Sequence, residues 1–405
     1  MAATTRFSDD DRRFMRLALR LAERGRGGTH PNPVVGAVLV SRAGRIIARG
    51  FHRRAGGQHA EAAALSAPGL RARGATLYVS LEPCCHSGRT GPCTELIIKA
   101  GVARVIVGCG DANPMVDGRG IARLRRAGLR VDVGCLETEC RATNRAFFTW
   151  IAQGRPRVTL KAAASLDGFI AAADGSSRWI TGPRARRVAH ELRAAHDAVL
   201  VGAGTILADD SRLTVRLRRR HPGGASGTLG GAPLRVVLDG RLRTPPSARV
   251  LRRPPDPPAL IVGARGASER RARALRAAGA DVVLLPARGG RVPVRTLLKE
   301  LAHREVQSLL VEGGAAVHGA FIDARVVDSV ALFVAPRLLG RGRPVAAGAG
   351  SSLARSLTLA GLRSRSVGDD ILLIADNVHG NHRDDRPRAD ATAVRRPRAA
   401  ARRGG

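Results

Sequence analysis

The sequence is poor in the features that membrane-spanning and nucleic-acid-binding proteins use in quantity. No apolar run approaches the roughly 18 to 20 residues that span a bilayer, so we expect no contact with a membrane. Aromatic residues make up 3% of the chain, which leaves little for the base-stacking platforms of single-strand binders. The first residues contain no apolar segment of a secretory signal and carry three acids, Asp9 to Asp11. We therefore expect a cytoplasmic protein.

Lysine is almost absent, although the formal net charge is +35. Only Lys99, Lys161 and Lys299 are lysines, and the arginines that supply the charge are scattered through every segment. A strongly basic surface favours phosphate backbones, but scattered arginines indicate a compositional bias rather than a designed binding stripe. We predict no nucleic-acid partner, and attraction to anionic small-molecule substrates.

The cysteine content argues against a disulfide-stapled domain. The chain has six cysteines in 405 residues, all between Cys84 and Cys140. Such spacing in a long chain favours metal binding or burial over disulfides. Hydrophobic residues at 44% and charged residues at 25% are typical of globular proteins. At roughly 150 residues per domain, this length predicts two domains.

Hydrophobic periodicity predicts alternating helices and strands. A helix capped by Ser8 should open the chain. Strands are predicted at 34–40, 75–81 and 104–107, and helices at 59–65, 93–100 and 120–127. This alternation indicates an α/β sandwich.

The pattern restarts after Gly154-Arg155-Pro156, with a new strand at 158–163. We predict one domain over residues 1–153 and a second over 154–377. Residues 221–231 are predicted to be a flexible loop, and 378–405, with almost no large apolar residue, a disordered basic tail.

Two short motifs predict a zinc centre. His59-Ala60-Glu61 opens one predicted helix, and Pro83-Cys84 and Cys93 bracket the loop before another. One histidine and two cysteines suit a zinc ion that keeps its fourth position open for water. Glu61, two residues from His59, would then carry a proton from the attacking water to the substrate. Cys85, Cys109, Cys135 and Cys140 are predicted to be structural.

The zinc motif departs from the H-x-E and P-C-x-x-C signature of nucleobase deaminases, because eight residues separate the two cysteines. The run LEPCCHSGRTGPC at 81–93 instead resembles the deaminase domain of the bifunctional riboflavin-biosynthesis deaminase-reductases. HPNPVVGAV at 30–38 and DANP at 111–114 also match that family. The resemblance implies a cytidine-deaminase-like α/β/α sandwich. It also implies a set of substrate-binding residues: Asn32, His52, His86, Arg89 and Asn113.

The second half resembles the reductase domain of the same family. Matching runs lie at 160–168, 179–182, 197–202, 205–216, 311–314 and 335–340. The resemblance implies a dihydrofolate-reductase-like α/β domain that uses NADPH. Independently, a strand at 308–311, two glycines and a helix from about Ala315 form a turn that suits a diphosphate. No G-x-G-x-x-G follows a strand, so a Rossmann fold is not supported.

The family's contacts carry over to this sequence position by position. Those implied for the cofactor are Ala163, Trp179, Thr205, Asp209, Gly240, Gly314, Ala315, Ala316, Val317, His318, Gly319 and Ala320. Those implied for the sugar-phosphate substrate are Ser177, Arg193, Leu213, Arg216, Glu312 and Lys161. Arg193 and Arg216 are expected to clamp a phosphate, because a guanidinium offers a permanently charged fork.

The resemblance predicts an enzyme with one zinc ion and NADPH. It would deaminate 2,5-diamino-6-(5-phosphoribosylamino)pyrimidin-4-one and then reduce the ribosyl group to ribityl, giving 5-amino-6-(5-phosphoribitylamino)uracil. Two alternatives stay open at this point: a nucleic-acid-editing deaminase, which the charge suggests, and a zinc-stabilised scaffold, which the presence of Glu61 disfavours. The sequence leaves open whether the chain forms a homo-oligomer.

Overall fold

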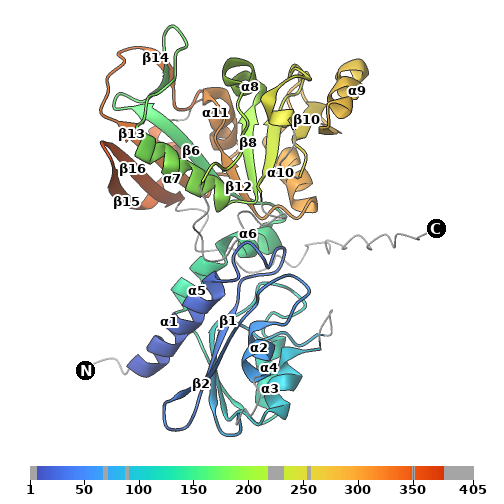
Figure 1. Ribbon diagram of the computed structural model, residues 1–405, viewed down its shortest axis with the longest axis vertical. Helices are drawn as coiled ribbons and strands as arrows, with labels where there is room; N and C mark the ends of the chain where they lie inside the picture. The colour runs from blue at the N-terminus through green and yellow to red at the C-terminus, as the bar shows by residue number, and fades with distance from the viewer. Residues whose placement is uncertain are drawn as a thin grey trace, which may run out of the picture.

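The computed structural model of the chain describes residues 7–66, 72–86, 91–217, 232–252, 257–348, 350 and 352–377. These residues form a five-stranded sheet, a nine-stranded sheet and a two-stranded ribbon. The two large sheets lie end to end along the long axis of the molecule, and α6 (Arg145–Gln153) lies between them (Figure 1). No helix in the described part is long and apolar enough to cross a membrane. The tail predicted at 378–405 and the loop predicted at 221–231 lie outside the described residues.

The first sheet has the strand order β2-β1-β3-β4-β5. Strands β1, β2 and β3 pair antiparallel, whereas β3, β4 and β5 run parallel. The strands are β1 (Gly36–Val40), β2 (Ile46–Phe51), β3 (Thr76–Leu81), β4 (Arg104–Cys109) and β5 (Arg130–Val133). The strands predicted from the sequence at 34–40, 75–81 and 104–107 are confirmed within two residues at each end.

Helices cover both faces of the first sheet, because its central strands are apolar on both faces. Val38 and Val40 pack with Phe14 and Met15, whereas Ala37 and Leu39 belong to a second core cluster. The first face carries α1 (Asp9–Glu23), α5 (Glu137–Thr143) and α6; the other carries α2 (Ala60–Leu65), α3 (Cys93–Lys99) and α4 (Arg119–Arg126) (Figure 1). The predicted α/β/α sandwich is confirmed. So is the Ser8 cap, which accepts a hydrogen bond from the Asp11 amide in a capping box.

The second sheet has the order β11-β10-β9-β8-β12-β6-β13-β16-β15 and is parallel from β11 to β13. Its parallel strands are β6 (Arg157–Ser165), β8 (Ala198–Gly202), β9 (Leu234–Leu238), β10 (Leu260–Ala264), β11 (Asp281–Leu285), β12 (Ser308–Val311) and β13 (Ser329–Ala335). Strands β15 (Leu359–Val367) and β16 (Asp370–Asn377) add an antiparallel edge, and β7 (Phe169–Ala172) and β14 (Gly342–Pro344) form the ribbon.

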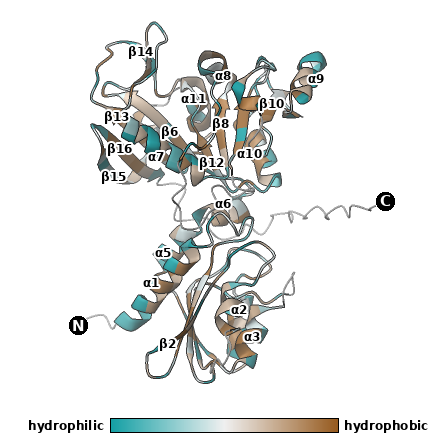
Figure 2. Cartoon of the chain, viewed as in Figure 1, coloured by the Kyte–Doolittle hydropathy of each residue, from teal (hydrophilic) through white to brown (hydrophobic). Residues whose placement is uncertain are grey.

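Two helical layers cover the second sheet. One contains α7 (Pro183–Ala194), α8 (Ala203–Asp209) and α9 (Glu269–Ala277); the other contains α10 (Val294–His303) and α11 (Ala315–Asp323). The central strand β8 is buried along its whole length, and its residues are coloured as hydrophobic in Figure 2. Parallel strands bring their carboxyl ends to one edge, which is where open α/β sheets bind ligands.

Helix α6 contacts both sheets. Its Phe147 and Phe148 pack in the core of the first sheet. On the other side, the Trp150 indole N-H donates to the Ala302 carbonyl at 3.1 Å, and Arg145 binds the Asp376 carboxylate at 3.0 Å. The helix therefore ties the two halves of the chain together.

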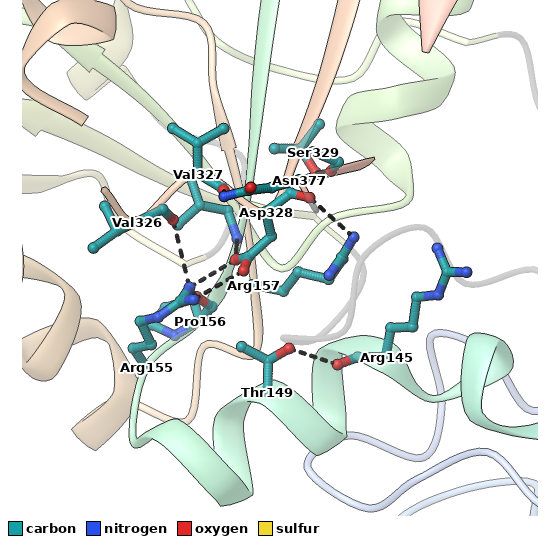
Figure 3. A network of polar contacts seen from close by, with 12 residues as sticks. Arg145, Thr149, Arg155, Pro156, Arg157, Val326, Val327, Asp328, Ser329 and Asn377 are labelled. Carbon is teal, nitrogen blue, oxygen red and sulfur yellow. Dashed lines mark hydrogen bonds and ion pairs between the residues drawn. The ribbon is translucent and has the colours of Figure 1, made fainter. Parts of the chain in front are cut away.

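Asp328 anchors the segment that leaves α6 (Figure 3). The two terminal nitrogens of Arg155 bind its carboxylate at 2.6 and 2.8 Å. The same carboxylate accepts the Val158 amide at 2.7 Å. Asp328 is 3% exposed, so this is a buried ion pair with its hydrogen bonds satisfied. It fixes the start of β6 against the start of β13.

Candidate active sites

Three predicted ligands meet beside β3. His59 precedes the first residue of α2, Cys93 begins α3, and Cys84 lies in the loop after β3. Their ligating atoms all lie within 4.8 Å of one another. His59 Nδ1 is 3.5 Å from the Cys84 sulfur and 3.3 Å from the Cys93 sulfur. A tetrahedral zinc ion with bonds of about 2.0 to 2.3 Å holds a nitrogen and a sulfur about 3.5 Å apart, so the donor set and its spacing fit zinc.

The electrostatics of this cluster favour a thiolate. A hydrogen bond from the Cys93 thiol, together with one from the His59 ring, lowers the pKa of Cys84 to about 4. Thiolate is the form in which cysteine binds metal. Cys85 lies outside the cluster, near the Met115 carbonyl, and the buried Cys109, Cys135 and Cys140 have no disulfide partner. The prediction that these four cysteines are structural agrees with their positions.

Glu61 lies in the first turn of α2 and is 3% exposed. Burial, and then the charge of Cys84, raise the pKa of Glu61 to about 7. Its hydrogen bond with the Cys93 side chain places the carboxyl next to the ligands. An acid with a pKa in this range can both accept and release a proton near neutral pH.

Asn32 and His52 lie next to the ligands. His52 Nδ1 donates to the Gln58 carbonyl at 2.9 Å, and burial lowers the pKa of this histidine. The neutral ring therefore carries its proton on Nδ1, and Nε2 accepts from the Asn32 amide at 3.2 Å. The His52 and His59 rings are 5.2 Å apart. Two predicted substrate residues thus share one wall with a predicted metal ligand.

The other predicted substrate residues of this half are placed less directly. His86 has a buried Nδ1 that finds no hydrogen-bond partner among the described atoms. Asn113 sits in a turn, where its side-chain oxygen accepts the Met115 amide at 3.1 Å. Arg89 lies outside the described residues.

Sequence reasoning missed Glu82, which organises the loop that carries Asn113. Its buried carboxylate accepts the backbone N-H groups of Asp111, Gly118 and Ile121 at 3.3, 3.0 and 3.1 Å. The signal in the sequence was a charged residue placed between an apolar strand and Pro83-Cys84. A carboxylate that is buried at such a position needs hydrogen-bond donors from elsewhere in the chain.

A second cluster lies where β12 ends. Arg193 binds both Glu312 carboxylate oxygens at 2.7 Å, and Lys161 Nζ lies 4.0 Å from the same carboxylate. Burial opposes ionisation of Glu312, but the charges of Arg193 and Lys161 prevail and lower its pKa to about 2. Burial also lowers the pKa of Lys161.

The pairing with Glu312 changes the expected role of Arg193. Its fork, which the sequence assigned to a phosphate, lies on a carboxylate, and its remaining terminal nitrogen donates to the Thr214 carbonyl at 3.1 Å. Arg216 is exposed, and its backbone amide donates to His190 Nδ1 at 3.3 Å. Of the two predicted clamp residues, Arg216 is the one whose guanidinium is exposed. Leu213 is buried, with a positive φ of 56°.

The predicted cofactor turn is present. Gly314 precedes the first residue of α11, and the predicted helix from about Ala315 is confirmed. A Cβ at Gly313 would come within 2.9 Å of Val317, whereas one at Gly314 would meet only the Thr205 hydroxyl at 3.7 Å. The backbone at Gly314 is therefore accessible, and the first amides of a helix have no intrahelical acceptor. This cradle fits a diphosphate.

The other predicted cofactor residues divide into exposed and buried groups. Trp179 is 59% exposed, with the Arg186 guanidinium 4.3 Å from its ring centre. The Asp209 carboxylate lies 3.6 Å from Arg178. His318 is buried, and its two ring nitrogens lie 2.8 and 3.3 Å from the carbonyl oxygens of Val345 and Val311. Its imidazole is therefore occupied within the protein.

Comparison with known proteins accounts for both halves of the chain. Residues 8–109 match the family model described as the cytidine and deoxycytidylate deaminase zinc-binding region, and residues 156–373 match the RibD C-terminal domain. The riboflavin biosynthesis protein RibD of Aquifex aeolicus is 41% identical over 90% of this chain and 97% of its own length. That of Escherichia coli is 40% identical over 82% of this chain and 89% of its own.

Solved structures agree over the whole described fold. Acinetobacter baumannii RibD superposes with a TM-score of 0.80 at 37% identity, covering 91% of this chain and 99% of the other. A diaminohydroxyphosphoribosylaminopyrimidine deaminase/5-amino-6-(5-phosphoribosylamino)uracil reductase from Thermotoga maritima gives 0.77 at 36% identity, with the same coverage.

Proposed function

This chain belongs to the RibD family of bifunctional riboflavin-biosynthesis enzymes, and on that basis we propose a role for each residue of its two sites. Its amino-terminal domain is a zinc deaminase and its carboxyl-terminal domain an NADPH-dependent reductase. We take the domains to be 1–153 and 154–377, a division supported by their separate sheets. The cytoplasmic location stays a prediction.

The proposed substrate is the one named for the relatives: 2,5-diamino-6-(5-phosphoribosylamino)pyrimidin-4-one for the deaminase, and its deaminated product for the reductase. The observation that carries this proposal is the meeting of His59, Cys84 and Cys93 beside the buried Glu61. The neutral His52 orients the Asn32 side chain, whose carbonyl oxygen and second amide hydrogen suit a pyrimidine edge.

His59, Cys84 and Cys93 would hold the zinc ion, which supplies a Lewis acid that makes water nucleophilic near neutral pH. Glu61 would accept a proton from the attacking water, pass it to the ring nitrogen and assist the departure of ammonia. His52 keeps one tautomer because Gln58 fixes its Nδ1-H. Glu82 holds the loop that carries Asn113, and the Asn113 side chain would contact the substrate.

In the reductase domain a bound NADPH would supply a hydride for C1 of the ring-opened sugar. The turn at Gly314 and the Thr205 side chain would hold its diphosphate. Glu312, Lys161 and Arg193 form a buried polar floor for the sugar, because the ion pair fixes all three side chains. Arg216 would bind the substrate phosphate.

The test is incubation of the purified full-length protein with the diaminopyrimidine phosphate, with and without NADPH. We expect ammonia release without NADPH, and NADPH oxidation only after deamination. Ammonia release that requires NADPH, or NADPH oxidation in a variant unable to deaminate, would contradict the order of the two steps.

A further inference from the structure

Four exposed arginines follow the carboxyl ends of β9, β10 and β11. They are Arg241, Arg265, Arg288 and Arg291, called the arginine rim below. Within the described part of the chain, none of them has a carboxylate within ion-pair distance. The nearby Asp239 is fully buried and accepts two hydrogen bonds from Thr244. The rim is therefore a concentration of uncompensated positive charge.

Backbone packing brings Arg241 against the turn that carries Arg288 and Arg291. These two arginines exchange backbone hydrogen bonds of 2.9 and 3.0 Å across a glycine pair. A Cβ at Gly240 would lie 2.1 Å from the Gly290 carbonyl, so the chain at Gly240 touches this turn. A Cβ at Gly290 would lie 4.0 Å from Arg241 Nε. The Arg241 side chain thus extends over the same turn.

The order of the strands indicates in which direction a bound dinucleotide would run along the edge of the sheet. This step rests on the proposed function. On that proposal, the sugar to be reduced lies against Lys161 on β6 and Glu312 at the end of β12. The nicotinamide lies next to the sugar, because it gives the hydride. The Gly314 turn follows β12, and Thr205 follows β8. Because the sheet order is β6-β12-β8-β9-β10-β11, a dinucleotide that crosses β8 carries its adenosine end over β9 to β11.

We propose that the arginine rim, chiefly Arg241, binds the 2′-phosphate of NADPH and selects NADPH over NADH. A guanidinium forks onto a phosphate and stays charged at any working pH. Nicotinamide-cofactor enzymes that prefer NADH commonly place an acid near the 2′-hydroxyl, whereas an arginine accommodates the 2′-phosphate. Among the described residues of the rim, arginines stand where an NADH-preferring enzyme would have that acid.

The experiment measures binding rather than turnover. Dissociation constants of NADPH, NADH, adenosine 2′,5′-bisphosphate and adenosine 5′-monophosphate are determined by calorimetry on the full-length protein and on Arg241→Ala and Arg291→Ala. Arg273→Ala is the matched control, because Arg273 is an exposed arginine on α9 that is not part of the rim. Each side chain is exposed, so the variants should fold.

We expect Arg241→Ala to raise the Kd of NADPH by about 10- to 100-fold, as loss of a charge-assisted hydrogen bond does. The Kd of NADH should change less than twofold, and the bisphosphate should lose affinity while the monophosphate does not. Arg273→Ala should change none of these. Added salt should narrow the gap between NADPH and NADH in the wild type.

Two results would overturn the subsite. One is an unchanged NADPH Kd in both Arg241→Ala and Arg291→Ala; the other is an equal loss of NADPH and NADH affinity. A wild-type protein that binds neither dinucleotide would overturn the reductase assignment as well, which separates failure of the proposed function from failure of the subsite.

Discussion

Glu312 should make the stability of the reductase domain depend on pH. Its pKa falls from the usual 4.5 to about 2 in the folded chain, because Arg193 and Lys161 surround the buried carboxylate. At about 1.4 kcal/mol per pH unit, this difference corresponds to about 3 kcal/mol of stability at neutral pH. Since the folded pKa is the lower one, that stability is complete above pH 4.5 and disappears as the pH falls toward 2.

The substitution Glu312→Gln tests this reasoning, because it keeps the shape of the side chain and removes the charge. It leaves Arg193 and Lys161 as buried cations without their partner, a loss of about 3 to 5 kcal/mol for pairs of this kind. Urea unfolding followed by circular dichroism should show a lower unfolding free energy at neutral pH. At pH 2 the charge-dependent part of this difference should fall below about 1 kcal/mol, because the carboxyl is then half protonated in the folded chain and fully protonated in the unfolded chain.

Glu269→Gln is the control, because its partner Arg276 is bound at 2.9 Å on the exposed surface of α9. Exposed pairs contribute about 0 to 1 kcal/mol. Equal effects of the two substitutions at neutral pH would refute the argument. So would a deficit in Glu312→Gln that is the same at acidic and neutral pH, since a charge-dependent term must vanish with the charge.

Three further predictions concern the zinc site and the junction. Cys84→Ser should lose most of its zinc in elemental analysis, and full occupancy would show that the ligand assignment is wrong. Glu61→Gln should retain zinc but lose about 10²- to 10⁴-fold in ammonia release, while reduction of pre-deaminated substrate continues; joint loss of both activities would indicate misfolding instead. Asp328→Ala should lower the unfolding free energy by about 3 to 5 kcal/mol, because Arg155 and the Val158 amide lose their buried acceptor. A loss of unfolding free energy similar to that in Glu269→Ala would contradict the buried-pair argument.

The parts of the structure that the sequence predicted well are those that local residues encode. The Ser8 cap depends on Asp11, three residues away, and the strand-glycine-helix turn at 308–315 is contiguous. His59 and Glu61 share one helical turn, and Cys84 and Cys93 flank one loop. Their spacing therefore predicted the metal site without any knowledge of the sheet.

The parts that the sequence did not predict depend on residues far apart in the chain. Arg193 and Glu312 are 119 residues apart, and only the pairing of β8 with β12 brings them together. Without knowledge of that strand pairing, nothing in the sequence distinguished Arg193 from the other arginines, and a phosphate was a reasonable partner to predict for it. Glu82 similarly binds amides 29 to 39 residues away. Pattern and propensity do not encode such side-chain partners; topology determines them.

The same topology sets the two sites apart. The amino ends of β6, β8 and β12 face the first domain. Gln307 donates to the Pro31 carbonyl at 2.5 Å, and a cavity of about 250 Å³ beside this contact is lined by residues of both domains, among them Asn32, Thr159 and Ser308. Glu312 and Gly314 lie beyond the opposite, carboxyl ends of the strands. The first domain thus packs against the amino ends of these strands and not against their carboxyl ends, where open α/β sheets bind ligands. The zinc-ligand cluster lies beside β3 of the first sheet and the Glu312 cluster at the carboxyl end of β12 in the second, so the two candidate sites belong to different sheets.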